Sequence, residues 1–291
     1  MEVKEFFDVR TFTLTYIVWD KKTKDGVIID AVLDYEPIGS RIWPESLKNY
    51  LDYLKSNSIQ LHYILETHAH ADHLSAAPYL KKQFPKAKTA IGEQIVSIQE
   101  FFKKVFSLEL LKTDGSQFDL LLKDSEVLRA GSLEIKVIHT PGHTPACVCY
   151  LAGDKLFTGD LLFMPDYGTG RCDFPKGDSH SLYHSVMEKI YTLPENTQIY
   201  TGHDYMPNGR PLRFLSTVGE SKKNNIQLPS SRSESDFVKF RETRDSNLSA
   251  PKLLYQSVIS NINGGGLPPL QENGKNYFKI PVNLEDPGHL L

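Results

Sequence analysis

The sequence predicts a layered α/β fold in which two β-sheets carry helices on their outer faces. One observation behind this prediction is an order of elements that occurs twice, in which strands and a helix lead into a strand, a polar loop and another helix. The other is that each group of metal-binding residue types follows directly after a predicted strand. Loops at strand ends on a rigid sheet commonly carry functional side chains. We therefore expect an α/β domain with a site built from such loops.

The first half of the chain contains predicted strands and helices in alternation. Residues 4–19 alternate apolar and polar side chains and predict one strand, and a polar turn at residues 21–26 leads into a buried strand at 27–30. These two strands form an antiparallel hairpin. Apolar residues at helical spacing predict a helix over residues 45–57. A strand at 61–65 and a helix from residue 75 to 84 follow, with Pro78 in its first turn.

The second half repeats this arrangement. It begins with a short strand at 89–91 and an apolar helix within residues 93–111. A strand at 133–138 and a hairpin of residues 147–151 and 156–158 come next. Residues 178–191 predict a helix with Asp178 or Ser179 as its N-cap, and residues 198–200 predict a strand.

The composition changes beyond about residue 210. We expect residues 1–210 to form the catalytic domain and residues 211–291 to form a C-terminal helical extension packed on it, because the extension has too few apolar residues for its own core. Within the extension, residues 234–248 and 251–262 are predicted helices, and the last twenty residues form an extended tail.

Composition and charge limit the classes of function. The 291 residues are 40% hydrophobic and 24% charged, as in ordinary globular proteins. A formal net charge of −3 provides no general attraction to nucleic acid or to an anionic membrane. No apolar stretch approaches the roughly 20 residues of a membrane-spanning helix, and the N-terminus has no signal-like layout. Three cysteines do not make a disulfide framework, so we expect a cytoplasmic protein.

Residues 68–73 spell H-A-H-A-D-H and form the densest group of candidate ligands. Three imidazoles and one carboxylate in one short loop suit zinc, iron and similar transition metals. A solvated, histidine-rich turn is the alternative, but so many ionisable groups together are costly unless a cation compensates them. The loop therefore predicts a metal site.

Three further candidates are His143 in P-G-H-T, Asp160 in T-G-D and His203 in G-H-D. Together with the histidine loop they resemble the metallo-β-lactamase fold superfamily over roughly residues 5–205. The resemblance implies an αββα sandwich and two metal positions with Asp160 between them. The implied ligands are His68, His70 and His143 for one position, and Asp72, His73 and His203 for the other.

Other segments resemble the persulfide dioxygenases of that superfamily. They are G-T-G-R-C-D-F-P at 168–175, S-L-Y-H-S at 181–185, P-G-H-T-P at 141–145 and T-G-D-L-L at 158–162. Residues 240–245 and 261–263 also resemble the longer bacterial members of that group. The resemblance implies oxidation of glutathione persulfide by O₂ to sulfite and glutathione, in sulfide and persulfide detoxification. It implies one Fe(II) per chain, held by His68, His143 and Asp160.

Two histidines and one carboxylate suit a non-haem Fe(II) oxygenase because they leave coordination positions open. In that case His70, Asp72, His73 and His203 orient water and the ligands. The same residues could instead hold two zinc ions in a dinuclear thioester hydrolase that resembles glyoxalase II. A non-catalytic metal-binding or sulfide-sensing protein is a third hypothesis.

Four residues are candidates for substrate binding: Arg171, Tyr183, Tyr205 and Arg210. Arg171 is also a catalytic candidate, because a loop arginine can pair bidentately with a glutathione carboxylate; pairing with Asp173 is the structural alternative. Cys172, in the same loop, could be a substrate-side thiol. The expected partners are a small thiol persulfide and O₂, and an apolar C-terminal extension is also compatible with a homodimer.

Overall fold

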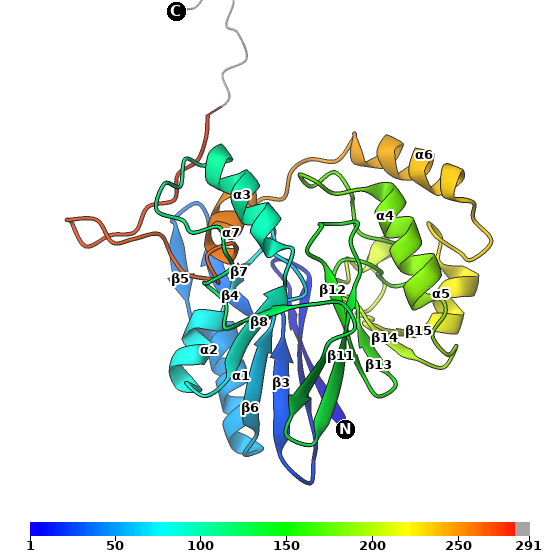
Figure 1. The fold of residues 1–291 in the computed structure, drawn as a ribbon, viewed down its shortest axis with the longest axis horizontal. Coiled ribbons are helices and arrows are strands. Elements are labelled where there is room, and N and C mark those ends of the chain that lie inside the picture. The colour runs from blue at the N-terminus through cyan, green and yellow to red at the C-terminus, as the bar shows by residue number, and fades with distance from the viewer. Residues whose placement is uncertain (283–291) are drawn as a thin grey trace, which may run out of the picture.

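The computed structural model describes residues 1–282, and residues 283–291, the end of the predicted tail, lie outside the described part. Two six-stranded sheets form its centre (Figure 1). The first has the order β1 (Glu2–Asp8), β2 (Thr13–Trp19), β3 (Asp25–Ile29), β6 (Gln60–Leu65), β8 (Lys88–Gly92) and β9 (Leu120–Leu122). The second has the order β10 (Val127–Ala130), β11 (Leu133–His139), β12 (Val148–Ala152), β13 (Lys155–Phe157), β14 (Gln198–Tyr200) and β15 (Leu215–Thr217). A small sheet contains β5 (Arg41–Trp43), β4 (Val32–Glu36) and β7 (Leu74–Ser75).

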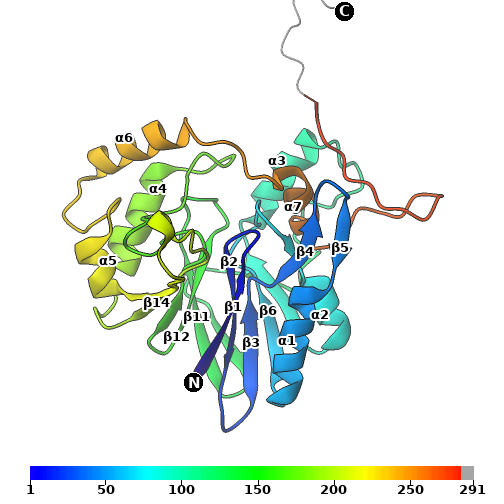
Figure 2. The ribbon, with the colours of Figure 1, turned by 180° about the vertical axis from the view of Figure 1, so that it is seen from behind.

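Helices cover both outer faces, so the predicted α/β sandwich of two sheets and outer helices is confirmed. Helices α1 (Glu45–Ser56) and α2 (Ala77–Gln83) lie outside the first sheet (Figures 1 and 2). Helices α4 (Ser179–His184) and α5 (Val218–Asn224) lie outside the second, and α6 (Glu234–Asp245) packs on α4. Helices α3 (Ile95–Val105) and α7 (Leu254–Asn261) lie together at the upper end of the first sheet.

The main core lies between the two sheets. Its buried side chains come from alternate positions of facing strands, such as Tyr16 and Ile29 of the first sheet and Val137, Tyr150 and Phe157 of the second. A second cluster places Leu47, Tyr50 and Leu54 of α1 against the first sheet's outer face, as their helical spacing predicts. Burial on both faces fixes the sheets as a rigid support for the loops at their ends.

The predicted hairpin and the predicted N-cap are confirmed, whereas the single strand predicted at residues 4–19 is wrong. The hairpin of β2 and β3 pairs antiparallel, and the Asp178 carboxylate caps α4 by accepting hydrogen bonds from the backbone N–H groups of His180 and Ser181. The single strand predicted at residues 4–19 is two antiparallel strands, β1 and β2. The chain reverses through residues 9–12, which contain neither glycine nor proline, and Phe12 adopts a φ of 60°. The turn is held by Asp8, whose carboxylate accepts hydrogen bonds from the backbone N–H groups of Arg10 and Thr11. A single aspartate without glycine or proline is a weak sequence signal for such a reversal.

Two predicted helices differ in detail. The apolar stretch at 93–111 forms α3 only as far as Val105, and Ser107 beyond it has a left-handed φ of 49°. The helix predicted at 178–191 continues past α4 as a π-helical segment over Ser185–Ile190. Within residues 1–282, no helix combines the length and apolar character needed to cross a bilayer.

The predicted extension supplies parts of both halves. Strand β15 pairs with β14 as the edge of the second sheet, and α5 and α6 bury Val218 and Phe237 against that sheet's outer cluster. Helix α7 buries Val258, Ile259 and Ile262 in the cluster around α3. Residues beyond 210 therefore contact the elements that carry the candidate ligands from two sides.

Candidate metal centre

The histidine loop begins where β6 ends, and hydrogen bonds at both ends hold its backbone. The Thr67 backbone N–H and hydroxyl both donate to the buried Asp30 carboxylate, at 2.7 and 2.8 Å. At the far end, the Asn261 side-chain amide of α7 donates to the carbonyls of His70 and His73, each at 2.8 Å. The loop is thus fixed by β3 and by the C-terminal helix together.

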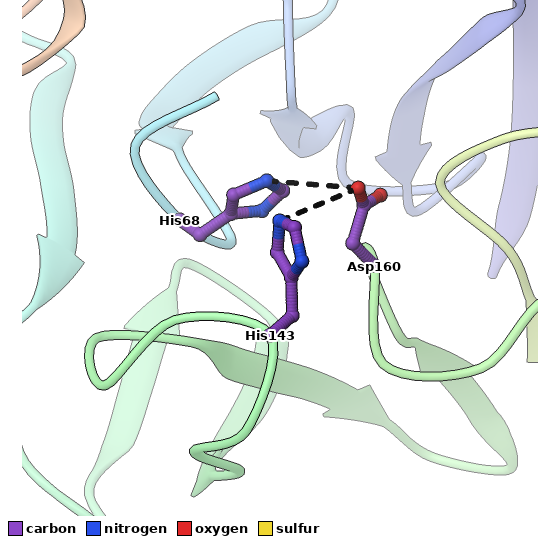
Figure 3. A group of neighbouring side chains, drawn as sticks. All are labelled: His68, His143 and Asp160. Atoms are coloured by element: carbon purple, nitrogen blue, oxygen red, sulfur yellow. Dashed lines mark ion pairs between the residues drawn. The ribbon is translucent and has the colours of Figure 1, made fainter. Parts of the chain in front are cut away.

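Candidate ligands from three other loops meet those of the histidine loop. The Asp160 Oδ2 atom lies 3.9 Å from His68 Nε2 and 3.6 Å from His143 Nε2 (Figure 3). Its other oxygen, Oδ1, lies 3.3 Å from His203 Nε2. His203 Nε2 is also 3.5 Å from Asp72 Oδ2. The two oxygens of Asp160 therefore face two different sets of nitrogen atoms.

Several of these atoms are buried without a hydrogen-bond partner. Among the candidate ligands of the described residues they are His68 Nε2, His70 Nδ1, His73 Nε2, Asp160 Oδ1 and His203 Nδ1. A buried polar atom without a partner costs about 1–3 kcal/mol, so five in one place require an explanation. Imidazole nitrogens and carboxylate oxygens around a common centre are a donor set for transition metals. The residues therefore fit a metal centre.

Two of the histidines, His143 and His70, have a partner on the remaining nitrogen that fixes the orientation of the ring. His143 Nδ1 donates to the Arg171 carbonyl at 2.7 Å, which leaves Nε2 free as a ligand atom. His70 Nε2 lies 3.0 Å from Asp30 Oδ1 and 3.3 Å from Glu66 Oε2, which leaves Nδ1 free. Partners of this kind are typical of metal-binding histidines.

Burial and local charges shift the pKa values of several candidate ligands. They favour the metal-binding forms of His68 and Asp72, a neutral imidazole and a carboxylate, but not that of His70. Burial, reinforced by the charges of neighbouring histidines, holds the pKa of His68 well below its ordinary value, so the ring is neutral. Burial alone would raise the pKa of Asp72, but His73 and His203 outweigh it and hold that pKa well below its usual range. Burial lowers the pKa of His70, but Asp30 and Glu66 outweigh that effect and raise it well above its ordinary value.

The loop at residues 168–174 packs directly against Asp160, and its glycines have a steric reason. A Cβ atom on Gly170 would lie 1.9 Å from the Asp160 carbonyl oxygen. Gly168 has a φ of 112°, a conformation that side-chain-bearing residues rarely adopt. The G-T-G pattern thus lets this loop approach the metal centre closely.

A cavity of about 500 Å³ opens beside the centre, with Asp72, His143, Asp160 and His203 among its lining residues. Aromatic side chains form much of its wall; they are Phe12, Tyr35, Trp43, Phe163, Tyr167 and Tyr205. Arg244 and Lys252 of the C-terminal region also line it. Within the described residues, neither makes an ion pair or a side-chain hydrogen bond.

The structure places the four predicted substrate residues in different surroundings. The Arg171 guanidinium pairs bidentately with Asp173 and donates to the Ser249 carbonyl, as in the structural alternative, while still lining the cavity. Tyr205 also lines it, is 36% exposed and stacks on the His203 ring.

The other two lie outside the set of residues that line this cavity. Arg210 pairs with Asp166 and with the buried Asp204. The Tyr183 hydroxyl donates to the Arg232 carbonyl at 3.1 Å. These contacts give both side chains a role in holding loops.

Cys172 is buried, and burial raises the pKa of its thiol well above the ordinary value. A buried, protonated thiol is a poor nucleophile, which speaks against the hypothesis of a substrate-side thiol.

Four residues around the centre were given no role from the sequence, although two of them lie in the segments 240–245 and 261–263 that carry part of the resemblance: Asp30, Glu66, Arg241 and Asn261. Asp30 and Glu66 each directly follow or end a predicted strand, which was a usable signal. Asn261 and Arg241 lie in helices far along the chain, and no spacing in the sequence connects them to the histidine loop.

Comparison with known proteins provides one family match. Residues 9–203 match the model of the Metallo-beta-lactamase superfamily. Glyoxylase B2 of Dictyostelium discoideum is 45% identical over 97% of both chains. The persulfide dioxygenase ETHE1 of Homo sapiens, a mitochondrial protein, is 31% identical over 90% of this chain and 88% of its own. Among solved structures, ETHE1 from Myxococcus xanthus superposes with a TM-score of 0.74 at 29% identity, over 91% of this chain and all of that one.

Proposed function

The chain belongs to the metallo-β-lactamase superfamily and is expected to act as a metal-dependent enzyme; within that family we propose that it hydrolyses thioesters of an anionic thiol of the glutathione type at a centre of two divalent cations. The dinuclear hydrolase was the alternative to the persulfide dioxygenase at the level of sequence. We prefer the hydrolase because two cations provide partners for more of the buried ligand atoms than one cation does.

The observation that carries this proposal is the set of unpartnered atoms on both sides of Asp160. One metal at His68, His143 and Asp160 Oδ2 leaves His70 Nδ1 and His73 Nε2 buried without partners. Each such atom costs about 1–3 kcal/mol. Two cations satisfy both halves, because the Asp160 oxygens face different sets of nitrogens.

The residues that would hold the two cations are those that the family resemblance implies. By that resemblance His68, His70 and His143 would hold one cation, and Asp72, His73 and His203 the other, with Asp160 between them. In the structure the ligand atoms of His68, His143 and Asp160 lie within 4.8 Å of one another, and so do those of His70, Asp72 and His73. When bound, a pair of divalent cations lowers the pKa of a coordinated water and polarises a carbonyl oxygen.

The chain's own residues would orient the substrate. The aromatic wall, with Tyr205 and Phe163, packs against the apolar part of a thiol moiety and excludes water from one side of the centre. Arg244 and Lys252 are cations without a carboxylate partner among the described residues, and they would bind the carboxylates of the thiol. Arg171, held by Asp173, would keep its loop in place beside the thiol.

The sequence identities to the relatives support the hydrolase over the dioxygenase. Glyoxylase B2 is 45% identical to this chain, whereas the persulfide dioxygenase is 31% identical. A probable metallo-hydrolase of Burkholderia pseudomallei is 42% identical over 97% of this chain and 99% of that protein. The more similar relatives therefore carry glyoxylase and hydrolase names.

A mononuclear iron persulfide dioxygenase is the second candidate, and one specific observation favours it. The ligand atoms of His68, His143 and Asp160 lie within 4.8 Å of one another, and two histidines with one carboxylate are the ligand types of non-haem Fe(II) oxygenases. When bound there, iron would supply the activation of O₂. The similarity of residues 168–175 to persulfide dioxygenases supports the same candidate. A cytoplasmic location and a homodimer stay predictions with either activity.

One experiment separates the two candidates. The protein is purified without added metal, its metal content per chain is measured, and portions loaded with zinc or iron are assayed with a glutathione thioester and with glutathione persulfide under O₂. The hydrolase predicts two ions per chain and thioester cleavage without O₂ uptake. One iron per chain with O₂ uptake and no thioester cleavage would overturn it in favour of the dioxygenase.

A further inference from the structure

Arg241 of α6 is an unusual residue for its position, because it is an arginine with only 1% of its surface exposed. Its Nε and Nη2 atoms donate to the Asp245 carboxylate one helical turn later, at 3.1 and 2.6 Å. Its Nη1 atom donates to the carbonyls of Thr169 and Gly170 and to the side-chain oxygen of Gln227. This buried arginine therefore holds, through its hydrogen bonds, the backbone of the loop that packs on the metal centre.

Asp245 contacts the same loop from the other side of the ion pair. Its Oδ2 atom accepts the backbone N–H of Cys172 at 2.8 Å. The two residues of α6 therefore bind the loop immediately before and immediately after Arg171, the residue whose backbone carbonyl accepts the His143 Nδ1 proton at 2.7 Å. That hydrogen bond determines which His143 nitrogen is available to a metal.

We propose that Arg241 and Asp245 are positioning residues for the metal ligand His143, acting through the backbone of residues 169–172. The ion pair places the Arg171 carbonyl, and this carbonyl holds the His143 ring with Nε2 toward Asp160, 3.6 Å away. The C-terminal helix α6 is thereby a functional part of the centre, although it contributes no ligand atom.

A carbonyl held only by its own loop would be a poorer anchor. Residues 168–170 contain two glycines, because a Cβ atom at Gly168 would clash with Gln227 and one at Gly170 would clash with Asp160. The same two glycines give the backbone extra conformational freedom. Arg241 is suited to hold such a backbone, because its planar fork reaches several acceptors at once, whereas a lysine ammonium acts from a single point. The helix thus compensates for the freedom that the glycines introduce.

The inference needs only that His143 binds a metal, which both candidate functions share. If two ions are bound, the effect falls on the ion held by His143 and spares the one held by Asp72, His73 and His203. The wild-type metal content and substrate assays test the proposed function, whereas the comparison of variants below tests the positioning role. Failure of one is therefore distinguishable from failure of the other.

The experiment uses metal ions alone as probes of the full chain. Two variants are prepared: R241M/D245L, which removes the buried ion pair as a unit and so avoids an uncompensated charge, and R241K, which retains the charge but not the fork. The zinc dissociation constant is measured by competition with a chelator, and the Co(II)-substituted proteins are compared by their visible absorption spectra. Phe237→Leu is the matched control, because Phe237 is fully buried on the same helix but packs in the cluster outside the second sheet.

We expect both Arg241 variants to weaken the affinity for the ion at His143 by roughly 10- to 100-fold, the usual effect of losing an outer partner of a ligand. Their Co(II) spectra should change, whereas Phe237→Leu should lower the melting temperature of the metal-free protein without changing either metal readout. The positioning role is overturned if R241M/D245L and R241K bind zinc like the wild type with unchanged Co(II) spectra. It is also overturned if Phe237→Leu weakens zinc binding as much as they do at an equal loss of melting temperature.

Discussion

Replacement of Asp72 by asparagine should remove one of two metal ions and leave the other. Asp72 Oδ2 lies 3.5 Å from His203 Nε2 and 3.2 Å from His73 Nδ1, on the side of Asp160 away from His68 and His143. The Thr13 hydroxyl donates to the same oxygen at 3.1 Å, a hydrogen bond that an asparagine oxygen still accepts. Asp72→Asn therefore removes charge with little change in shape.

The expected magnitude follows from that charge. A unit negative charge about 4 Å from a unit positive charge contributes on the order of 4 kcal/mol at an effective dielectric constant of about 20. Since about 1.4 kcal/mol is a factor of ten, the affinity for the ion on this side should fall by roughly a thousandfold or more. The ion on the other side of Asp160 should be affected far less.

The assay is metal content per chain after equilibration at controlled free zinc, together with hydrolysis of a glutathione thioester. Asp72→Asn should bind one ion where the wild type binds two, and its hydrolysis should fall close to background. Asp166→Asn is the control, because Asp166 pairs with Arg210 outside the ligand cluster. A variant with wild-type metal content and wild-type hydrolysis would refute the two-metal centre.

Three further predictions concern the cavity, a hairpin turn and the loop beside the centre. The double variant Arg244→Ala/Lys252→Ala should raise KM for a glutathione thioester by roughly 100-fold with little change in kcat, because each residue loses a charge-assisted contact of about 1.5 kcal/mol. An unchanged KM in steady-state kinetics would exclude them as carboxylate ligands. Hydrogen bonds outweigh desolvation and lower the pKa of Asp25 from its ordinary value near 3.8 to about 2, so Asp25 stabilises the fold above pH 4 and loses this effect as the pH falls toward 2. Thermal unfolding of Asp25→Asn should accordingly vary less between pH 4 and pH 2 than that of the wild type, and equal slopes would contradict this. Gly170→Ala should abolish metal binding or folding, because its Cβ would lie 1.9 Å from the Asp160 carbonyl oxygen; zinc binding and a melting temperature equal to the wild type would be inconsistent with that packing.

The sequence by itself determined the layered α/β fold and most of its elements. Apolar spacing is a local property, so the helix at 45–57 and the strand before the histidine loop could be predicted from a few neighbouring residues each. The candidate ligands were equally accessible, because histidine and aspartate directly after strands form a dense and specific pattern. The reversal at residues 9–12 was missed because its only marker is Asp8, whose carboxylate accepts the backbone N–H of Thr11, and because Phe12 takes a left-handed conformation that bulky residues rarely adopt.

Only the tertiary structure decided which partners the long, charged side chains of arginine and lysine bind. Arg171 and Arg210 looked like substrate ligands, but each folds against a carboxylate, whereas Arg244 and Lys252 face the cavity without such a partner among residues 1–282. A flexible cation pairs with whichever acceptor the fold brings near, and sequence spacing carries no information about that choice. For the same reason, the anchoring of the histidine loop by Asn261, and of the loop beside Asp160 by Arg241, became visible only when segments far apart in the chain lay side by side.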